Sequence, residues 1–170
     1  MKIRLKQSNG FTLVELLLYI AITVIIVTTI STFLIMIMTT QVKAQTVAEV
    51  EQQGLQVKQL ITQTIRNAAA INLPVNAGDT GSTLSVNTFD LTKSPTIFTL
   101  NNGTIYITEG TSTPLAITSS RIITSSLVFA RLGAKKQKNI SIDFTLSHYN
   151  PSNRNEYYYV QTFYATANAK

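Results

Sequence analysis

Residues 11–38 read FTLVELLLYIAITVIIVTTISTFLIMIM, and Glu15 is the only charged residue in these 28 positions. A helix that crosses a bilayer needs about 20 apolar residues, so this run is long enough to span a membrane. Three cations precede the run, and they are Lys2, Arg4 and Lys6. By the positive-inside rule, these cations orient the segment with its N-terminus in the cytoplasm and the rest of the chain outside.

Three interpretations of this region compete. A secretory signal peptide has the same basic start, and Val42-Lys43-Ala44 provides a small-x-small cleavage site. Its apolar core has only about 7 to 15 residues, however. A plain signal anchor would simply tether a domain. Inserting a carboxylate into the bilayer costs about 2.5 to 3.5 kcal/mol, and less near a helix end, so such a residue usually has a partner or a function. Neither interpretation gives Glu15 one. A purely structural Glu15 would snorkel to the interface or cap the helix N-terminus.

The third interpretation rests on Gly10-Phe11-Thr12-Leu13-Val14-Glu15, which lies between the basic leader and the apolar run. This junction resembles the class III leader junction of type IV pilins and type II secretion pseudopilins, and the resemblance covers roughly residues 1–30. It implies that a prepilin peptidase cuts after Gly10 and methylates the new terminal amine of Phe11. It also implies that Glu15 is the acidic residue of the family.

The chemistry of these residues agrees with such processing. Glycine lets the backbone before the scissile bond extend, and Gln7-Ser8-Asn9 disfavours helix beside it. After cleavage, Phe11 carries an amino cation and Glu15 lies one helical turn away. In a bundle of such helices, the Glu15 carboxylate of one subunit can pair with the amine of another. That pairing would offset the desolvation of both charges and set the axial register of assembly.

Four segments follow from this pattern: a cleaved leader at 1–10, an assembly helix at 11–38, an amphipathic continuation at 39–72, and a β-rich head at 73–170. The continuation has apolar or small residues at helical spacing, namely Val47, Val50, Gly54, Val57, Ile61, Ile65 and Ala68. Pro74 is the first proline and a stop signal. Within the helix, Gly54 is either simply tolerated or a bend. Many major pilins carry a proline in the apolar segment, and this chain has none there.

The head has short alternating runs that predict an antiparallel sheet. The predicted strands are 84–89, 96–100, 104–108, 121–124, 127–132, 140–149 and 157–167. Asn101-Asn102-Gly103 predicts a hairpin turn between the second and third of them. Ile140, Ile142, Phe144 and Leu146 alternate with polar residues, as in a half-buried strand. The amphipathic helix would cover one face of the sheet, which predicts an α+β, ladle-like and pilin-like architecture.

No pattern in the sequence indicates an enzyme. His148 is the only histidine and is interpreted as a surface residue without a general-base partner. The loop that contains Asp79 supplies a single carboxylate, too few for a calcium site. The chain has no cysteine, so it can form neither a disulfide nor a thiolate metal site. We therefore predict no catalytic residue, no metal and no cofactor.

Two further segments are candidate contact surfaces. Lys135, Lys136 and Lys138 lie in a strand connection. They form either a solvated turn or a salt-sensitive contact with DNA phosphates. The segment 156–164 (EYYYVQTFY) places tyrosines on both faces of one strand. One face is expected to lie in the core and the other against a neighbouring strand or subunit, and a tyrosine surface for adhesion is the alternative.

The resemblance predicts a minor pilin or minor pseudopilin. Its partners would be other pilin subunits, the prepilin peptidase, the membrane assembly platform and, before assembly, the lipid bilayer. The precursor would span the cytoplasmic membrane with its N-terminus inside and then enter a cell-surface or periplasmic filament. Twitching, adhesion, DNA uptake and protein secretion all stay open as its role. The alternative is a membrane-anchored extracytoplasmic binding module, a DNA or surface receptor, that does not assemble.

Overall fold

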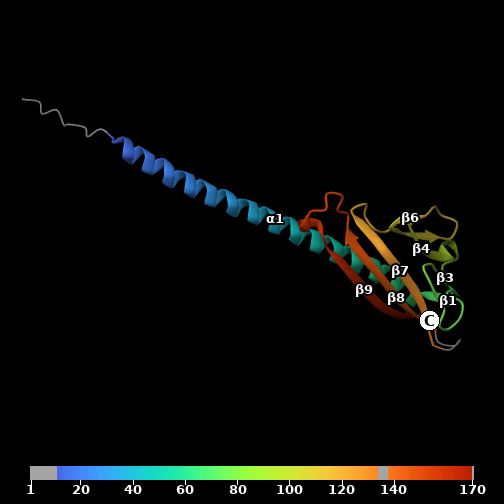
Figure 1. Ribbon diagram of the computed structural model, residues 1–170. Coiled ribbons are helices and arrows are strands. Elements are labelled where there is room, and N and C mark those ends of the chain that lie inside the picture. The colour runs from blue at the N-terminus through green and yellow to red at the C-terminus, as the bar shows by residue number, and fades with distance from the viewer. Residues whose placement is uncertain (1–10, 134–137, 170) are drawn as a thin grey trace, which may run out of the picture. The chain divides into compact units, whose positions relative to one another are not determined.

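The computed structural model describes residues 11–133 and 138–169, so the predicted leader lies outside the described residues. The described chain contains one long helix, α1 (Leu13–Arg66), and two antiparallel sheets (Figure 1). This is the α+β arrangement predicted from the sequence. The chain divides into two compact units, Met1–Gln41 and Val42–Lys170, and α1 contributes residues to both.

Both sheets belong to the second unit, and all neighbouring strands in them are antiparallel. The five-stranded sheet contains, in order, β1 (Ala68–Leu73), β3 (Leu84–Thr88), β4 (Thr96–Asn101), β5 (Thr104–Glu109) and β6 (Leu115–Ala116). The four-stranded sheet contains, in order, β2 (Thr80–Gly81), β7 (Ile122–Leu132), β8 (Asn139–His148) and β9 (Val160–Asn168). Two 3₁₀ turns, η1 (Leu91–Lys93) and η2 (Asn155–Tyr157), precede β4 and β9.

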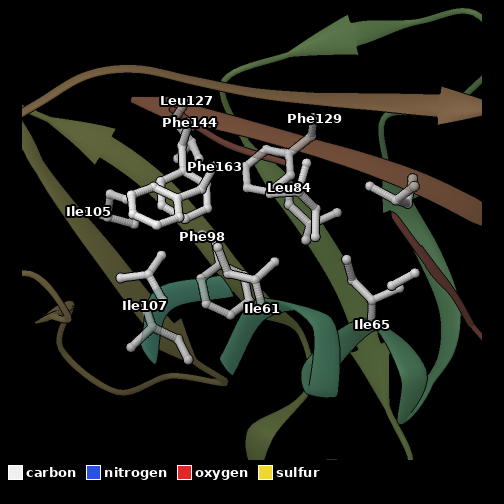
Figure 2. Close-up of a cluster of buried hydrophobic side chains, with 14 of the residues drawn as sticks. Ile61, Ile65, Leu84, Phe98, Ile105, Ile107, Leu127, Phe129, Phe144 and Phe163 are labelled. Carbon is white, nitrogen blue, oxygen red and sulfur yellow. The ribbon is translucent and has the colours of Figure 1, made fainter. Parts of the chain in front are cut away.

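The core of the second unit lies between α1 and the two sheets. On the helix, the buried residues of the amphipathic pattern are Val50, Gly54, Val57, Ile61 and Ile65. Figure 2 shows Ile61 beside Phe98 of β4, with Phe129 and Leu84 facing them from the two sheets. This spacing of three and four residues places one helix face against the strands, so the predicted amphipathic face is confirmed.

Two further predictions about the strands are confirmed. In β8 the side chains of Ile140, Ile142, Phe144 and Leu146 are fully buried and the residues between them are not. Strands β4 and β5 form the predicted hairpin, with Asn101 paired to Thr104. Both turn residues have positive φ, 48° at Asn102 and 75° at Gly103. That is the geometry of a two-residue turn that matches the twist of the strands.

Other boundaries differ from those predicted. The helix ends at Arg66, and the alanine-rich segment after it is strand β1, paired with β3, rather than helix to residue 72. Alanine's advantage in a helix is only a few tenths of a kcal/mol per residue, so tertiary strand pairing overrides it. The predicted strands 121–124 and 127–132 are one strand, β7, with a shift in register between Thr124 and Ser126. Strand β9 begins at Val160, because η2 occupies the segment before it.

Gly54 has a role that the sequence did not indicate. The helix continues through it, so it is not a break. A Cβ atom at this position would lie 2.0 Å from Cζ of Phe163 in β9. The ring of Phe163 in turn stacks on Phe144, with centroids 5.2 Å apart. Glycine is therefore present because the helix backbone must approach an aromatic ring closely.

Candidate assembly site on the N-terminal helix

The helix α1 begins immediately after the predicted cleavage junction. Phe11 and Thr12 are not helical, and the first helical hydrogen bond runs from the amide of Leu16 to the carbonyl of Thr12. The Thr12 hydroxyl accepts a hydrogen bond from the amide of Glu15, at 3.3 Å. Thr12 is therefore the N-cap, and Glu15 stands at the third helical position, the spacing of a capping box.

The Glu15 side chain is exposed in the first turn of α1. Within the described residues, its carboxylate has no hydrogen bond or ion pair. A negative charge in this turn interacts favourably with the helix dipole, so the capping explanation of Glu15 has physical support. The same carboxylate is also open to a cation from another chain.

Phe11, the predicted first residue of the processed chain, is exposed and lies over the first turns of the helix. Its ring centroid is 5.5 Å from that of Tyr19. The other predicted leader residues, Lys2, Arg4, Lys6 and Gly10, lie outside the described residues. The structure therefore places Phe11, the predicted methylation site, just before α1, and Glu15, the predicted assembly residue, in its first turn.

The rest of the apolar run forms a helix surface that its own unit leaves uncovered. All residues from Phe11 to Met38 are exposed. Their mean hydropathy reaches 2.6 in the most apolar window, so α1 is long and apolar enough to cross a membrane. Its threonine hydroxyls donate to backbone carbonyls one turn earlier, in Thr23, Thr28, Thr29, Thr32 and Thr40. These five threonine hydroxyls are thus bonded within the helix.

The predicted lysine contact is only partly within the described structure. Lys135 and Lys136 lie outside the described residues. Lys138 is half-buried, and its ammonium group donates to the carbonyl of Ala69 in β1, at 2.9 Å. Lys138 therefore connects the residue before β8 to β1 of the other sheet. One of the three lysines of the predicted DNA contact thus also takes part in the contact between the two sheets.

A second group of contacts, not anticipated from the sequence, binds α1 to the connection between β8 and β9. The Tyr159 hydroxyl donates to Glu51 at 2.8 Å, and Lys43 donates to the carbonyls of Asn155 and Tyr158. The hydrogen bond to Glu51 raises the pKa of Tyr159 above its usual value, with burial and the negative charge of Glu51 acting in the same direction. These contacts attach the connection to the helix.

His148 belongs to this group of contacts, so its interpretation as a surface residue was wrong. Only 9 % of its side chain is exposed. Its Nε2 atom lies 3.6 Å from a carboxylate oxygen of Glu49, whose other oxygen is 3.4 Å from Arg121. The ring also stacks on Tyr157, at 5.6 Å between centroids. Glu49 lies 99 residues before His148 in the sequence, so no local pattern could have revealed the pair.

The carboxylates of the head take part in local structure. Asp79 accepts a hydrogen bond from the amide of Asn76 at 2.8 Å and closes its own turn. Asp90 caps η1 by accepting from Thr92, and these bonds lower the pKa of Asp90. In the described ranges, no group of three or more histidine, aspartate or glutamate residues is placed to hold a metal ion.

Comparison of the chain with protein-family models, with curated proteins and with solved structures gives no match. Its function is therefore argued from its own residues. The features that bear on it are the predicted cleavage junction, the capped start of α1, the exposed carboxylate of Glu15 and the uncovered apolar surface that follows it.

Proposed function

We propose that this chain is a minor structural subunit of a type IV pilus or pseudopilus. In this proposal, prepilin peptidase processes the chain at the Gly10–Phe11 bond, and its N-terminal helix carries it into the filament. The observation that carries the proposal is the junction Gly10-Phe11-Thr12-Leu13-Val14-Glu15 ahead of an uninterrupted apolar helix. The chain would act as a structural protein and as the substrate of an enzyme.

The start of α1 supports processing at this point. Thr12 caps the helix, so Phe11, on the C-terminal side of the proposed scissile bond, lies before the first helical residue. A peptide bond inside a helix is held by hydrogen bonds and is poorly accessible to a protease, whereas this one precedes the helix. Cleavage there would leave the cap and the whole of α1 intact.

The exposed surface of α1 supports assembly through the helix. Large apolar side chains from Leu13 to Met38 are exposed in the single chain. In a filament, like helices of neighbouring subunits would cover them. In that bundle the Glu15 carboxylate would pair with the methylated amine of a neighbouring Phe11. A buried charge without a partner is costly, so this pairing would select one axial position of each subunit.

The processing step is tested by the mass of the N-terminal tryptic peptide, from the chain expressed with and without a prepilin peptidase. Trypsin cuts after Lys6 and next after Lys43, so an unprocessed chain gives peptide 7–43. A processed chain gives peptide 11–43 with one added methyl group. A peptide that begins at Gln45 would mean signal-peptide cleavage and would contradict the proposal.

The role of Glu15 is tested by comparing two substitutions in a cell that assembles the filament. Glu15→Gln removes the charge, and Thr12→Val removes the helix cap but keeps the charge. An uncompensated partner in a buried pair costs about 3 kcal/mol or more. We therefore expect Glu15→Gln to reduce the amount of subunit in sheared filaments at least tenfold, with Thr12→Val close to wild type. Equal losses in both variants would assign Glu15 to capping alone.

The alternative function, an anchored binding module, makes a different prediction in the same preparations. Such a chain would keep its leader and stay in the membrane fraction after shearing. Recovery of the unprocessed chain from membranes alone, in cells that make filaments, would favour it.

A further inference from the structure

The strand β9 forms one edge of the four-stranded sheet. Its neighbour on one side is β8, and in the described part of the chain no strand pairs with its other side. Figure 1 shows β9 as the outermost strand beside β8. A free edge of this kind presents a row of backbone donors and acceptors that another strand can bind.

The hydrogen bonds of β9 identify the backbone groups on the free edge. The amide of Ala169 donates to Lys138, and the carbonyl of Tyr159 accepts from His148. Backbone groups alternate in direction along a strand, so the odd-numbered residues bond to β8. The free edge therefore carries the amides and carbonyls of the even-numbered residues, which are Val160, Thr162, Tyr164, Thr166 and Asn168. Lys43 donates to the preceding carbonyl, that of Tyr158, so the row without a strand partner begins at Val160. Within this row, the carbonyl of Thr162 accepts a long hydrogen bond from the Gln161 side chain, at 3.4 Å.

The other sheet edges have features that discourage pairing with another chain. Strands β2 and β6 contain only two residues each. Strand β1 has two shifts in register, and Lys138 covers the carbonyl of Ala69. In contrast, β9 has nine residues, an unshifted register with β8, no charged residue and no proline. Proteins protect exposed sheet edges with short strands, irregular register, charged residues or proline. An edge that lacks all of these fits a strand that pairs with another chain.

The sequence of β9 is suited to pair with itself. Tyr164 is the central residue of Val160–Asn168 and belongs to the set that points its backbone to the free edge. Two copies of the strand in antiparallel orientation about Tyr164 overlap over all nine residues. Tyr164 then faces Tyr164, and Thr162 faces Thr166. Aromatic pairs and threonine pairs across strands are both favourable, and no like charges oppose each other.

We propose that the free edge of β9 binds β9 of a second copy of this chain, antiparallel and centred on Tyr164, so that two four-stranded sheets become one continuous sheet. The pairing is symmetric, with the same surface used by both copies. The exposed tyrosines agree with it, because the side chain of Tyr164 is 66 % exposed in the single chain. This inference is independent of leader processing and of filament assembly.

The pairing is tested by disulfide formation between introduced cysteines, because the chain has no cysteine of its own. Directly opposed residues of a hydrogen-bonded pair have Cα atoms about 5.5 Å apart. This distance suits a disulfide, which needs about 4.4 to 6.8 Å. In full-length protein in detergent micelles, Tyr164→Cys is expected to form a linked dimer under mild oxidation. Val128→Cys is the matched control. It is an exposed position of β7, which β8 separates from β9, and this variant should stay monomeric.

The register is tested with two variants that keep Tyr164. Thr162→Cys and Thr166→Cys should not form dimers alone, because each would lie about four residues, roughly 13 Å, from its own copy. Mixed together, they should form the linked heterodimer. Adding Tyr164→Lys to both chains places two like charges at the centre of the pair, and is expected to reduce linked heterodimer at least tenfold.

Two results would overturn the proposal. One is a monomeric Tyr164→Cys variant together with an unlinked mixture of the two threonine variants. The other is equal linkage at Val128 and Tyr164, which would mean association through the apolar helix. The unprocessed chain serves for every measurement, so failure of leader cleavage leaves the test unchanged.

Discussion

At the scale of single residues, the contact of Gly54 with Phe163 determines how closely α1 approaches β9. Alanine normally favours a helix over glycine by about 1 kcal/mol. Here the added methyl group would overlap the ring, at 2.0 Å from Cζ. Overpacking of this kind costs about 1 to 3 kcal/mol. We expect Gly54→Ala to lower the free energy of unfolding, measured by chemical denaturation of the full chain in detergent.

The double variant Gly54→Ala with Phe163→Leu is the control for this prediction. Leucine leaves room for the added methyl group. Gly54→Ala should therefore lower the free energy of unfolding by less in the Phe163→Leu background than in the wild type. If alanine stabilises the wild-type chain, the helix does not need a glycine at this position.

The hydrogen bond between Tyr159 and Glu51 predicts a dependence on alkaline pH. Because the pKa of Tyr159 is raised above 10.0 in the folded chain, its contribution to stability is complete below pH 10. It is lost as the pH rises through the raised pKa, since the unfolded chain releases the proton first. The midpoint temperature of thermal unfolding should therefore fall more steeply between pH 8 and 11 for the wild type than for Tyr159→Phe. Tyr158→Phe, at an exposed neighbour, should follow the wild type.

At the scale of elements, local signals were sufficient where an element's partner is near in the sequence. The β4–β5 hairpin is predicted correctly because Asn102 and Gly103 suit a turn with positive φ. Alternation predicts β8 because one face of that strand is buried. Strand β1 was missed because its alanines favour a helix, and only pairing with β3 makes the segment extended.

The hairpin turn supports a prediction about Gly103. Its φ is +75°, and an added Cβ would also lie 3.2 Å from Cγ2 of Ile123 in β7. A side chain in this backbone conformation costs about 1 to 2 kcal/mol. Gly103→Ala should therefore destabilise the chain by about this amount or slightly more. Gly78 has a similar φ of +88°, and an added Cβ there would have no atom within 4 Å. Gly78→Ala therefore measures the cost of the backbone conformation alone. A larger loss at Gly78 than at Gly103 would contradict the contact with Ile123.

At the scale of the whole molecule, the residues of the candidate site are neighbours in the sequence, whereas the contacts between α1 and the β8–β9 connection join distant segments. The junction at Phe11 and Glu15 is visible in the sequence because its residues are adjacent. The contacts of Lys43, Glu49 and Glu51 join residues about one hundred positions apart, so no local period contains them. His148 was misassigned for the same reason, since its burial depends on a helix far away in the sequence.

The division of the chain into two units predicts that the second unit, Val42–Lys170, folds without the apolar segment. Every residue of the hydrophobic core follows Val42, where the second unit begins. A chain that starts at Val42 should be soluble without detergent and should unfold cooperatively, within a few degrees of the full chain. Size-exclusion chromatography and circular dichroism measure both properties. Aggregation or the absence of a thermal transition would show that the second unit needs the first unit to fold.

The threonines of α1 give the apolar segment a property beyond its length. The hydroxyls of Thr23, Thr28, Thr29 and Thr32 each donate to a carbonyl of the same helix, at 2.7 to 2.9 Å. The segment therefore needs no outside partner for these groups, in lipid or against another helix. If the segment moved from lipid to a site against another helix, only the apolar groups around it would change. The hydrogen bonds of these threonines would therefore be the same in either surrounding, as the proposed transfer from membrane to filament requires.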